Sequence, residues 1–223
     1  MDNCHSGVLL SYASRLGYAR LERERSLPQA GTDARERCRQ VGIPEDRRVA
    51  TTPPLARQML ARACAAGVPA TWVTGDSVYG EKHPLRRWRE AQPQASGLAV
   101  SGKAYVWLGA QPRQVKTRLA SLPVEGWTRL SAGDGAKGPR WYAWRWGSLA
   151  DPVHPTGRRW LLVRRSLSEP TDLTAYVVFA PPATTLEEVV RVAGRRWTVE
   201  RGFEAAKGEV GREQYDVRSW TAW

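Results

Sequence analysis

The first hundred residues switch between strand-like and helix-like patterns of apolar positions. The apolar run at 7–13 predicts a buried strand, and residues 18–22 predict its hairpin partner across a short turn. Residues 52–67 carry apolar residues at helical spacing behind two prolines, which predicts a helix ended by a glycine. Three further elements are expected, namely a short strand, a helix and a strand, at 70–75, 84–91 and 97–101. This alternation predicts an α/β fold.

The pattern changes after that segment. Residues 105–180 have alternating apolar positions and many tryptophans, which indicates antiparallel strands at 140–146, 159–165 and 173–179. Residues 26–48 are polar and predict a loop with one helical turn near 33–39. The longest helical pattern covers 186–210, with Thr184 or Thr185 as its N-cap. We expect most of the 11 Trp to lie in the core, because aromatic residues at strand spacing usually do.

Charge adds a functional hint to this picture. The formal net charge is +12, and most of the 34 basic residues are Arg. A guanidinium donates hydrogen bonds in a planar fork that suits phosphates and base edges. The excess of positive charge predicts an anionic partner, of which nucleic acid is the commonest. The alternative is that an Arg-rich and Ala-rich composition reflects only the base composition of the genome.

Cysteine spacing and hydropathy exclude several classes of protein. Cys4, Cys38 and Cys64 stand far apart, and without a C-x-x-C pair they indicate no zinc ribbon. Three scattered cysteines fit a reducing cytoplasm better than a disulfide scaffold. No apolar run approaches the roughly 20 residues that a membrane helix needs. We therefore expect a cytoplasmic protein without a membrane partner.

Asp76 is the first residue with candidate chemistry. It follows the predicted strand at 70–75 and opens the loop G-D-S-V-Y-G. Ligands and metals gather at the carboxyl ends of strands in α/β sheets. The alternative is a turn aspartate that caps the next helix. Residues 75–82 superficially resemble a phosphate-binding loop, but they lack its Gly-Lys-Ser/Thr ending, so we reject that interpretation.

A second candidate is one face of the predicted helix at 186–210. Arg196, Glu200 and Lys207 are spaced by four and seven residues, which places them on one side of a helix. A carboxylate between two cations suits metal and phosphate binding where that side faces a cleft. Where it faces solvent, the same three residues form an ordinary salt-bridged surface.

The stretch R-R-W-T-V-E-R-G-F-E-A-A-K at 195–207 resembles the Y-x2-R-x3-E-x6-K signature of DDE transposases from bacterial insertion sequences. Arg196, Glu200 and Lys207 match its Arg, Glu and Lys, whereas Ala193 replaces the Tyr. The stretch W-V-T-G-D-S-V-Y-G resembles the family's second-aspartate region. Three more stretches resemble motifs of one subgroup, in order along the chain, at 30–38, 50–60 and 211–220.

The resemblance implies an α/β, ribonuclease H-like mixed sheet with helices, interrupted by a β-rich insertion. It implies three segments, which are the first part of the catalytic core, the insertion, and the part with the Glu helix, at 1–102, 103–182 and 183–223. The family's first Asp lies on a strand before the hairpin, and no residue here matches it, since Asp2 is too close to the hairpin. The expectation is therefore a truncated copy, incomplete at the N-terminus.

In the intact family, Asp and Glu hold two Mg²⁺ ions for DNA strand cleavage and transfer. The resemblance implies that Asp76 and Glu200 are metal ligands for Mg²⁺ or Mn²⁺, with doubtful binding where the first Asp is missing. It implies DNA contacts, to transposon ends, from a set of four cations, Arg195, Arg196, Arg201 and Lys207. The resemblance also implies that an intact member of the family can form a homodimer. A bacterial protein of this kind would lie at the nucleoid when it is bound to DNA.

Three hypotheses remain open from the sequence. The first is a transposase fragment that does not cleave DNA alone. The second is a non-catalytic basic module that binds DNA, and the third is a pseudogene product without a function. The first requires the carboxylates of Asp76 and Glu200 to converge on one cleft, whereas the second does not.

Overall fold

The computed structural model describes residues 7–14, 16–27, 35–40, 42–45, 50–108, 111–120, 122–123, 125–135, 137–150 and 158–196. These residues fall into two compact units, one before residue 69 and one from residue 69 onward. None of the helices among the described residues is long and apolar enough to cross a membrane.

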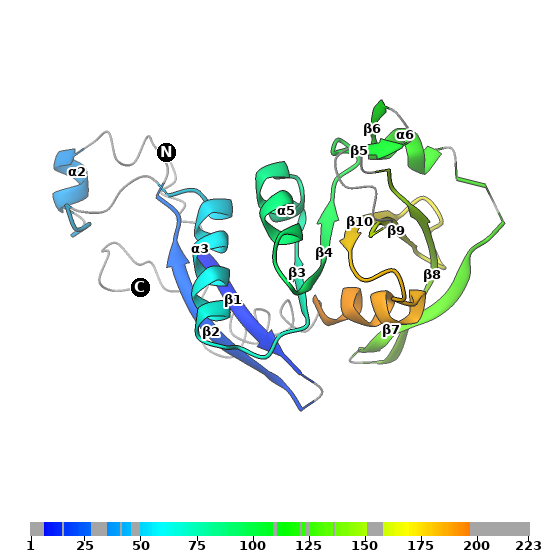
Figure 1. The fold of residues 1–223 in the computed structure, drawn as a ribbon, viewed down its shortest axis with the longest axis horizontal. Helices are drawn as coiled ribbons and strands as arrows, with labels where there is room; N and C mark the ends of the chain where they lie inside the picture. Colours follow the sequence, from blue (N-terminus) through cyan, green and yellow to red (C-terminus); the bar gives the residue numbers. More distant parts are fainter. Residues whose placement is uncertain are drawn as a thin grey trace. The chain divides into compact units, whose positions relative to one another are not determined.

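The first unit is built on a hairpin with one helix against it (Figure 1). β1 (Gly7–Ala13) pairs antiparallel with β2 (Tyr18–Arg25), as predicted. α3 (Thr52–Ala65) contacts both strands, and Met59 and Leu55 are its buried residues. Arg62 of this helix forms ion pairs with Glu22 and Glu24 of β2. The short α2 (Arg35–Gln40) confirms the helical turn predicted within the polar segment.

The second unit contains a six-stranded mixed sheet. Its strands, in spatial order, are β3 (Trp72–Gly75), β4 (Ala95–Val100), β10 (Leu173–Phe179), β9 (Arg159–Arg165), β8 (Gly138–Ser148) and β7 (Thr128–Gly135). β3 and β4 are parallel, and every other neighbouring pair is antiparallel. The late strands therefore continue the sheet that β3 and β4 begin, because β10 pairs directly with β4.

Alternating side chains give this sheet two buried faces. On β10, Tyr176 and Val178 belong to one apolar cluster, and Ala175 and Val177 belong to the other. β9 follows the same rule, since Leu162 lies in the first cluster while its two neighbours lie in the second. A strand that is buried on both faces must carry consecutive apolar residues. The run Y-V-V-F in β10 has this property.

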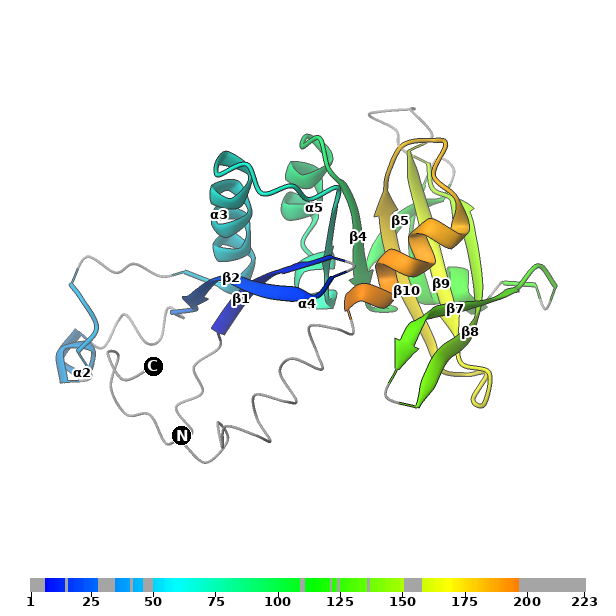
Figure 2. The same ribbon diagram turned by 90° about the horizontal axis from the view of Figure 1, so that it is seen from below.

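Different elements cover the two faces. Residues 186–196 form a helix that lies across the first face, with Val189 and Val190 almost fully buried (Figure 2). The second face is covered by residues of β5 (Tyr105–Leu108) and α6 (Val115–Ala120), which contribute Val106 and Val115 to the second cluster. β5 pairs antiparallel with the short β6 (Gln111–Gln114). α4 (Ser77–Gly80) and α5 (His83–Glu90) connect the parallel strands β3 and β4.

The mixed α/β sheet with helices agrees with the ribonuclease H-like class expected from the sequence. The expected core role of the tryptophans is confirmed for Trp144, which is 1% exposed. Trp146 and Trp160 are partly buried, pack against the same cluster and stack with ring centroids 5.5 Å apart. Trp141 is an exception at 45% exposure. The division into three segments at 1–102, 103–182 and 183–223 stays a prediction.

Candidate functional site

Asp76 lies directly after the last residue of β3, as the sequence predicts. The register of the parallel pair places Gly75 beside Leu98, so β3 and β4 end near the same edge of the sheet. The side chain of Asp76 is half-buried. Asp76 thus occupies the kind of strand-end position at which α/β sheets bind ligands.

Asp76 is also the N-cap of α4. Its Oδ1 accepts a hydrogen bond from the backbone N–H of Val78 at 2.9 Å, and its backbone is extended with φ −79° and ψ −174°. The capping alternative weighed from the sequence is therefore real. It does not exclude the functional one, because a cap engages one lone pair and a carboxylate offers about four acceptor sites. The cap fixes the carboxylate direction at the strand end.

The turn after Asp76 packs closely onto β4. A Cβ at Gly80 would lie 1.8 Å from the carbonyl oxygen of Ala99, so only glycine allows this approach. Burial, and then the negative charge of Asp76, raise the pKa of Tyr79 to about 12. The hydroxyl of Tyr79 therefore stays neutral to a higher pH than that of an ordinary tyrosine. The close approach of Gly80 thus seats α4, the helix that Asp76 caps, against β4.

The helix at 186–196 carries the other described candidate residues. Its N-cap is Thr185, whose Oγ1 accepts from the N–H of Glu188 at 3.2 Å. The indole Nε1 of Trp72 donates to Oε1 of Glu188 at 3.0 Å, which links the start of β3 to the first turn of this helix. The helix is thus fixed to the strand that leads to Asp76.

The last described turn of this helix is held against β7 and β8. A Cβ at Gly194 would lie 1.9 Å from the carbonyl oxygen of Ala132 on β7. Arg140 of β8 donates from NH2 to that same oxygen at 2.7 Å and to the carbonyl of Gly194 at 2.9 Å. Gly194 comes immediately before Arg195 and Arg196, so this contact sets the position from which both arginines extend.

The described residues include half of the predicted site. Asp76, Arg195 and Arg196 belong to the second compact unit, and both arginines are half-buried. Glu200, Arg201 and Lys207 lie outside the described residues. The convergence of Asp76 with Glu200 and the DNA-contacting role of the four cations therefore stay predictions. Within the described ranges, no three His, Cys, Asp or Glu side chains cluster as a metal site would require.

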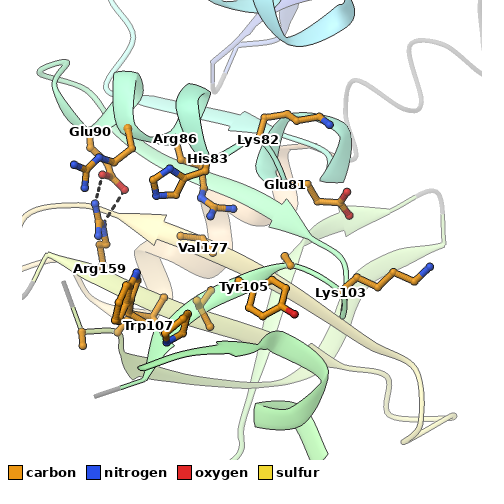
Figure 3. Close-up of a pocket in the computed structure, with 16 residues that line it drawn as sticks. Glu81, Lys82, His83, Arg86, Glu90, Lys103, Tyr105, Trp107, Arg159 and Val177 are labelled. Atoms are coloured by element: carbon orange, nitrogen blue, oxygen red, sulfur yellow. Dashed lines mark hydrogen bonds and ion pairs between the residues drawn. The ribbon is translucent and has the colours of Figure 1, made fainter. Parts of the chain in front are cut away.

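The structure adds a basic pocket that the sequence interpretation missed. It is a cavity of about 460 Å³ in the second unit, between α5, the start of the β5–β6 hairpin and strands β9 and β10. Figure 3 shows His83 and Arg86 on one side of it, and Tyr105 and Trp107 on the other. The charged residues among its lining are Glu81, Lys82, His83, Arg86, Arg87, Glu90, Lys103 and Arg159.

Charge in this pocket is unbalanced. Arg159 and Glu90, each with a side chain 11% exposed, form a two-pronged ion pair, in which Nε donates to Oε1 at 2.9 Å. That pair neutralises itself. In the part of the chain that the structure describes, the remaining four cations, Lys82, Arg86, Arg87 and Lys103, form no ion pair. Glu81 is the other acid in the lining, so positive charge prevails.

Two side chains of α5 reflect this environment. Burial, followed by the charges of Arg86 and Arg87, lowers the pKa of His83. Burial also lowers the pKa of Arg86, with Glu90 acting in the opposite direction. Arg86 donates from NH1 to the carbonyl of Gly80, which ties the pocket to the turn that follows Asp76.

The fold and the strand-end carboxylate define an α/β protein with a candidate ligand-binding position at the carboxyl end of β3. Residues 1–146 match the family model described as DDE superfamily endonuclease. The match covers more than half of the chain and includes Asp76, so the chain belongs to the DDE superfamily of endonucleases. A comparison with curated proteins gave no match. Members of this superfamily act on DNA and generally use divalent metal ions.

Proposed function

We propose that this chain is part of a DNA transposase of an insertion sequence, in which Asp76 and Glu200 bind Mg²⁺ or Mn²⁺ at the DNA cut site. The family match over residues 1–146 carries the proposal. The position of Asp76 supports it, because a carboxylate oxygen at a strand end suits a hard divalent cation. Asp76 is the candidate ligand among the described residues, and the resemblance to the family motif suggests Glu200 as the second.

When bound, the metal ions would activate a water or a DNA 3′-hydroxyl and stabilise the leaving oxygen. The chain's own residues have simpler roles. Asp76 offers carboxylate oxygen while α4 holds its orientation. Arg195, Arg196, Arg201 and Lys207 bind phosphates beside the scissile bond, which positions the DNA without reading its sequence. The net charge of +12 supports this second role.

Metal titration of the full chain tests whether the two carboxylates share a site. Asp76→Asn and Glu200→Gln should each weaken Mn²⁺ binding measured by calorimetry. The double variant should be little worse than either single one, because groups on one ion are not additive. Asp134→Asn, on an exposed residue of β7, is the matched control and should bind as the parent does. Independent, additive losses would refute a shared site.

We further propose that these 223 residues do not cleave DNA by themselves, since the family's first aspartate matches no residue of this sequence. The non-catalytic alternative, a basic module that only binds DNA, predicts the same result in a nicking assay. The two differ in metal binding, which only the transposase hypothesis requires. Nicking of supercoiled DNA with Mg²⁺ that is lost in Asp76→Ala would refute the proposed inactivity.

A further inference from the structure

The basic pocket beside α5 has the composition of a nucleotide site rather than of a structural ion-pair network. Its back wall is already neutral, because Arg159 and Glu90 satisfy each other. Its remaining four cations form no ion pair among the described residues, although the charge of Glu90 attracts Arg86. Arg86 is half-buried, and burial lowers its pKa. A concave site with excess guanidinium groups is complementary to a phosphate, which accepts paired hydrogen bonds.

The opposite wall is aromatic. Tyr105 and Trp107 are two residues apart on β5, so their side chains point to the same side of the strand. Trp107 is half-buried and Tyr105 is 58% exposed, and Figure 3 shows them across the cavity from His83 and Arg86. Proteins that bind single-stranded nucleic acid combine a cationic groove for the backbone with aromatic rings on which bases stack. This pocket has both parts within one cavity.

Size favours one nucleotide over a duplex. The volume of about 460 Å³ lies within the roughly 300–1,000 Å³ typical of small-ligand sites. A paired base is stacked inside its duplex and cannot enter such a cavity until it leaves the stack. An unpaired nucleotide presents its base and its phosphate together. Lys82 and Lys103 are exposed at the rim, where the phosphates of neighbouring nucleotides would pass.

We propose that this pocket binds one unpaired nucleotide of a DNA strand, its phosphate on Arg86 and Arg87 and its base against Trp107. The proposal rests on the proposed function for the choice of DNA, and it adds a second contact apart from the Asp76 carboxylate. A free nucleoside monophosphate has the same chemistry. Lys82 and Lys103 at the rim favour a DNA strand over a free monophosphate, because they extend the positive surface beyond the reach of a single phosphate.

Fluorescence anisotropy with the full chain and a labelled short oligothymidylate, in EDTA, tests the proposal. EDTA removes divalent cations, so any binding measured in it does not pass through the metal site. Arg87→Glu with Lys103→Glu should weaken binding by at least tenfold. In this double variant, the slope of log K against log salt concentration should be smaller in magnitude by about 1.4, because each lost phosphate contact on a single strand removes roughly 0.7. The matched control is Arg129→Glu with Lys137→Glu, on exposed residues that do not line the pocket, which should change affinity less than twofold.

The aromatic wall has its own test. Trp107→Ala should weaken oligothymidylate binding about tenfold, since a stacked base is typically worth that much. Trp107→Phe should restore most of it, and Trp141→Ala, on an exposed tryptophan outside the pocket, should have no effect. Thermal unfolding confirms that each variant is folded. Restoration by Phe separates stacking from a general loss of structure.

Competition identifies the ligand. The oligonucleotide should bind at least tenfold more tightly than thymidine monophosphate, and the monophosphate more tightly than inorganic phosphate. If inorganic phosphate competes as well as thymidine monophosphate, the proposed base contact is wrong. If thymidine monophosphate binds as tightly as the oligonucleotide, the proposal that the ligand is a DNA strand is wrong. Equal competition by a blunt duplex, or unchanged binding in the charge-reversed pair, would overturn the pocket itself. If the metal titration fails while the oligonucleotide binds as expected, the proposed metal site is wrong and the proposed nucleotide pocket stands.

Discussion

Gly194→Ala tests how closely the helix at 186–196 must approach the sheet. The added Cβ would lie 1.9 Å from the carbonyl oxygen of Ala132 and 2.7 Å from its carbon, whereas ordinary contacts begin at 3.4 Å. The helix and β7 must therefore separate by more than 1 Å. The obstacle is backbone, so no side-chain rotation can relieve it. The same movement strains the two hydrogen bonds of Arg140.

The magnitude follows from two opposing terms. Overpacking a tight contact typically costs about 1–3 kcal/mol, and a backbone obstacle places this case near 3. Alanine is favoured over glycine inside a helix by about 1 kcal/mol. The net loss is about 2 kcal/mol, or about 4–8 °C in Tm for a chain of this size.

Thermal and urea unfolding of the full chain measure this loss. Gly147→Ala is the control, because no atom lies within 4 Å of a Cβ built there, and it should leave the free energy of unfolding within about 0.5 kcal/mol of the parent. A Gly194→Ala protein that is as stable as the parent, or more stable, would refute the close approach of helix and strand.

Three other changes give separate tests. Thr185→Ala removes the N-cap of the same helix and should lower the free energy of unfolding by about 1 kcal/mol, whereas Thr185→Ser should retain it in urea unfolding. Burial lowers the pKa of His83 on folding, with the charges of Arg86, Arg87 and Arg159 acting in the same direction and that of Glu90 against it. Stability should therefore fall as pH drops through 6.5 and level off below the folded pKa. His83→Gln should remove that component of the measured pH–stability curve. Folding raises the pKa of Tyr79 to about 12, so the contribution of this shift to stability is complete below pH 10 and is lost as pH rises toward 12. A spectrophotometric titration should show one tyrosine that ionises near pH 12 and is missing in Tyr79→Phe. A titration curve that this substitution leaves unchanged would contradict the burial of the Tyr79 hydroxyl.

The sequence predicted the elements whose burial is regular. β9 and β10 lie at the predicted residues, 159–165 and 173–179, because strands that are buried on both faces carry long apolar runs. α5 was expected at 84–91 and is found at His83–Glu90. In each case the local pattern and the final packing select the same structure.

Elements at the margins were missed for the opposite reason. β7 has the sequence T-R-L-S-A-G-D-G, with two apolar residues in eight, and its register with β8 shifts between Ser131 and Asp134. β6 is Q-P-R-Q, a polar edge strand with a proline. Pairing with a neighbouring strand makes each of them a strand, and a single sequence does not show that partner.

The candidate site divides in the same way. Asp76 was identifiable because it follows an apolar strand and opens a turn, which are local features. The basic pocket was not, since its lining comes from α5, β5, β9 and β10, and Lys82 and Arg159 are distant in the chain. With 34 basic residues, composition indicates an anionic partner but not which cations share a cavity.

The two-sided burial of β10 limits how this protein can change in length. Val177 lines the pocket, whereas Tyr176 and Val178 pack in the cluster beneath the helix at 186–196. A one-residue insertion within β10 would turn every later side chain to the opposite face of the sheet. Residues that line the pocket would then face the helix at 186–196, and residues that pack beneath this helix would face the pocket. We therefore expect insertions and deletions to be tolerated in connecting segments and not within β10, and we expect substitutions on one face of the strand to leave the packing of the other face intact.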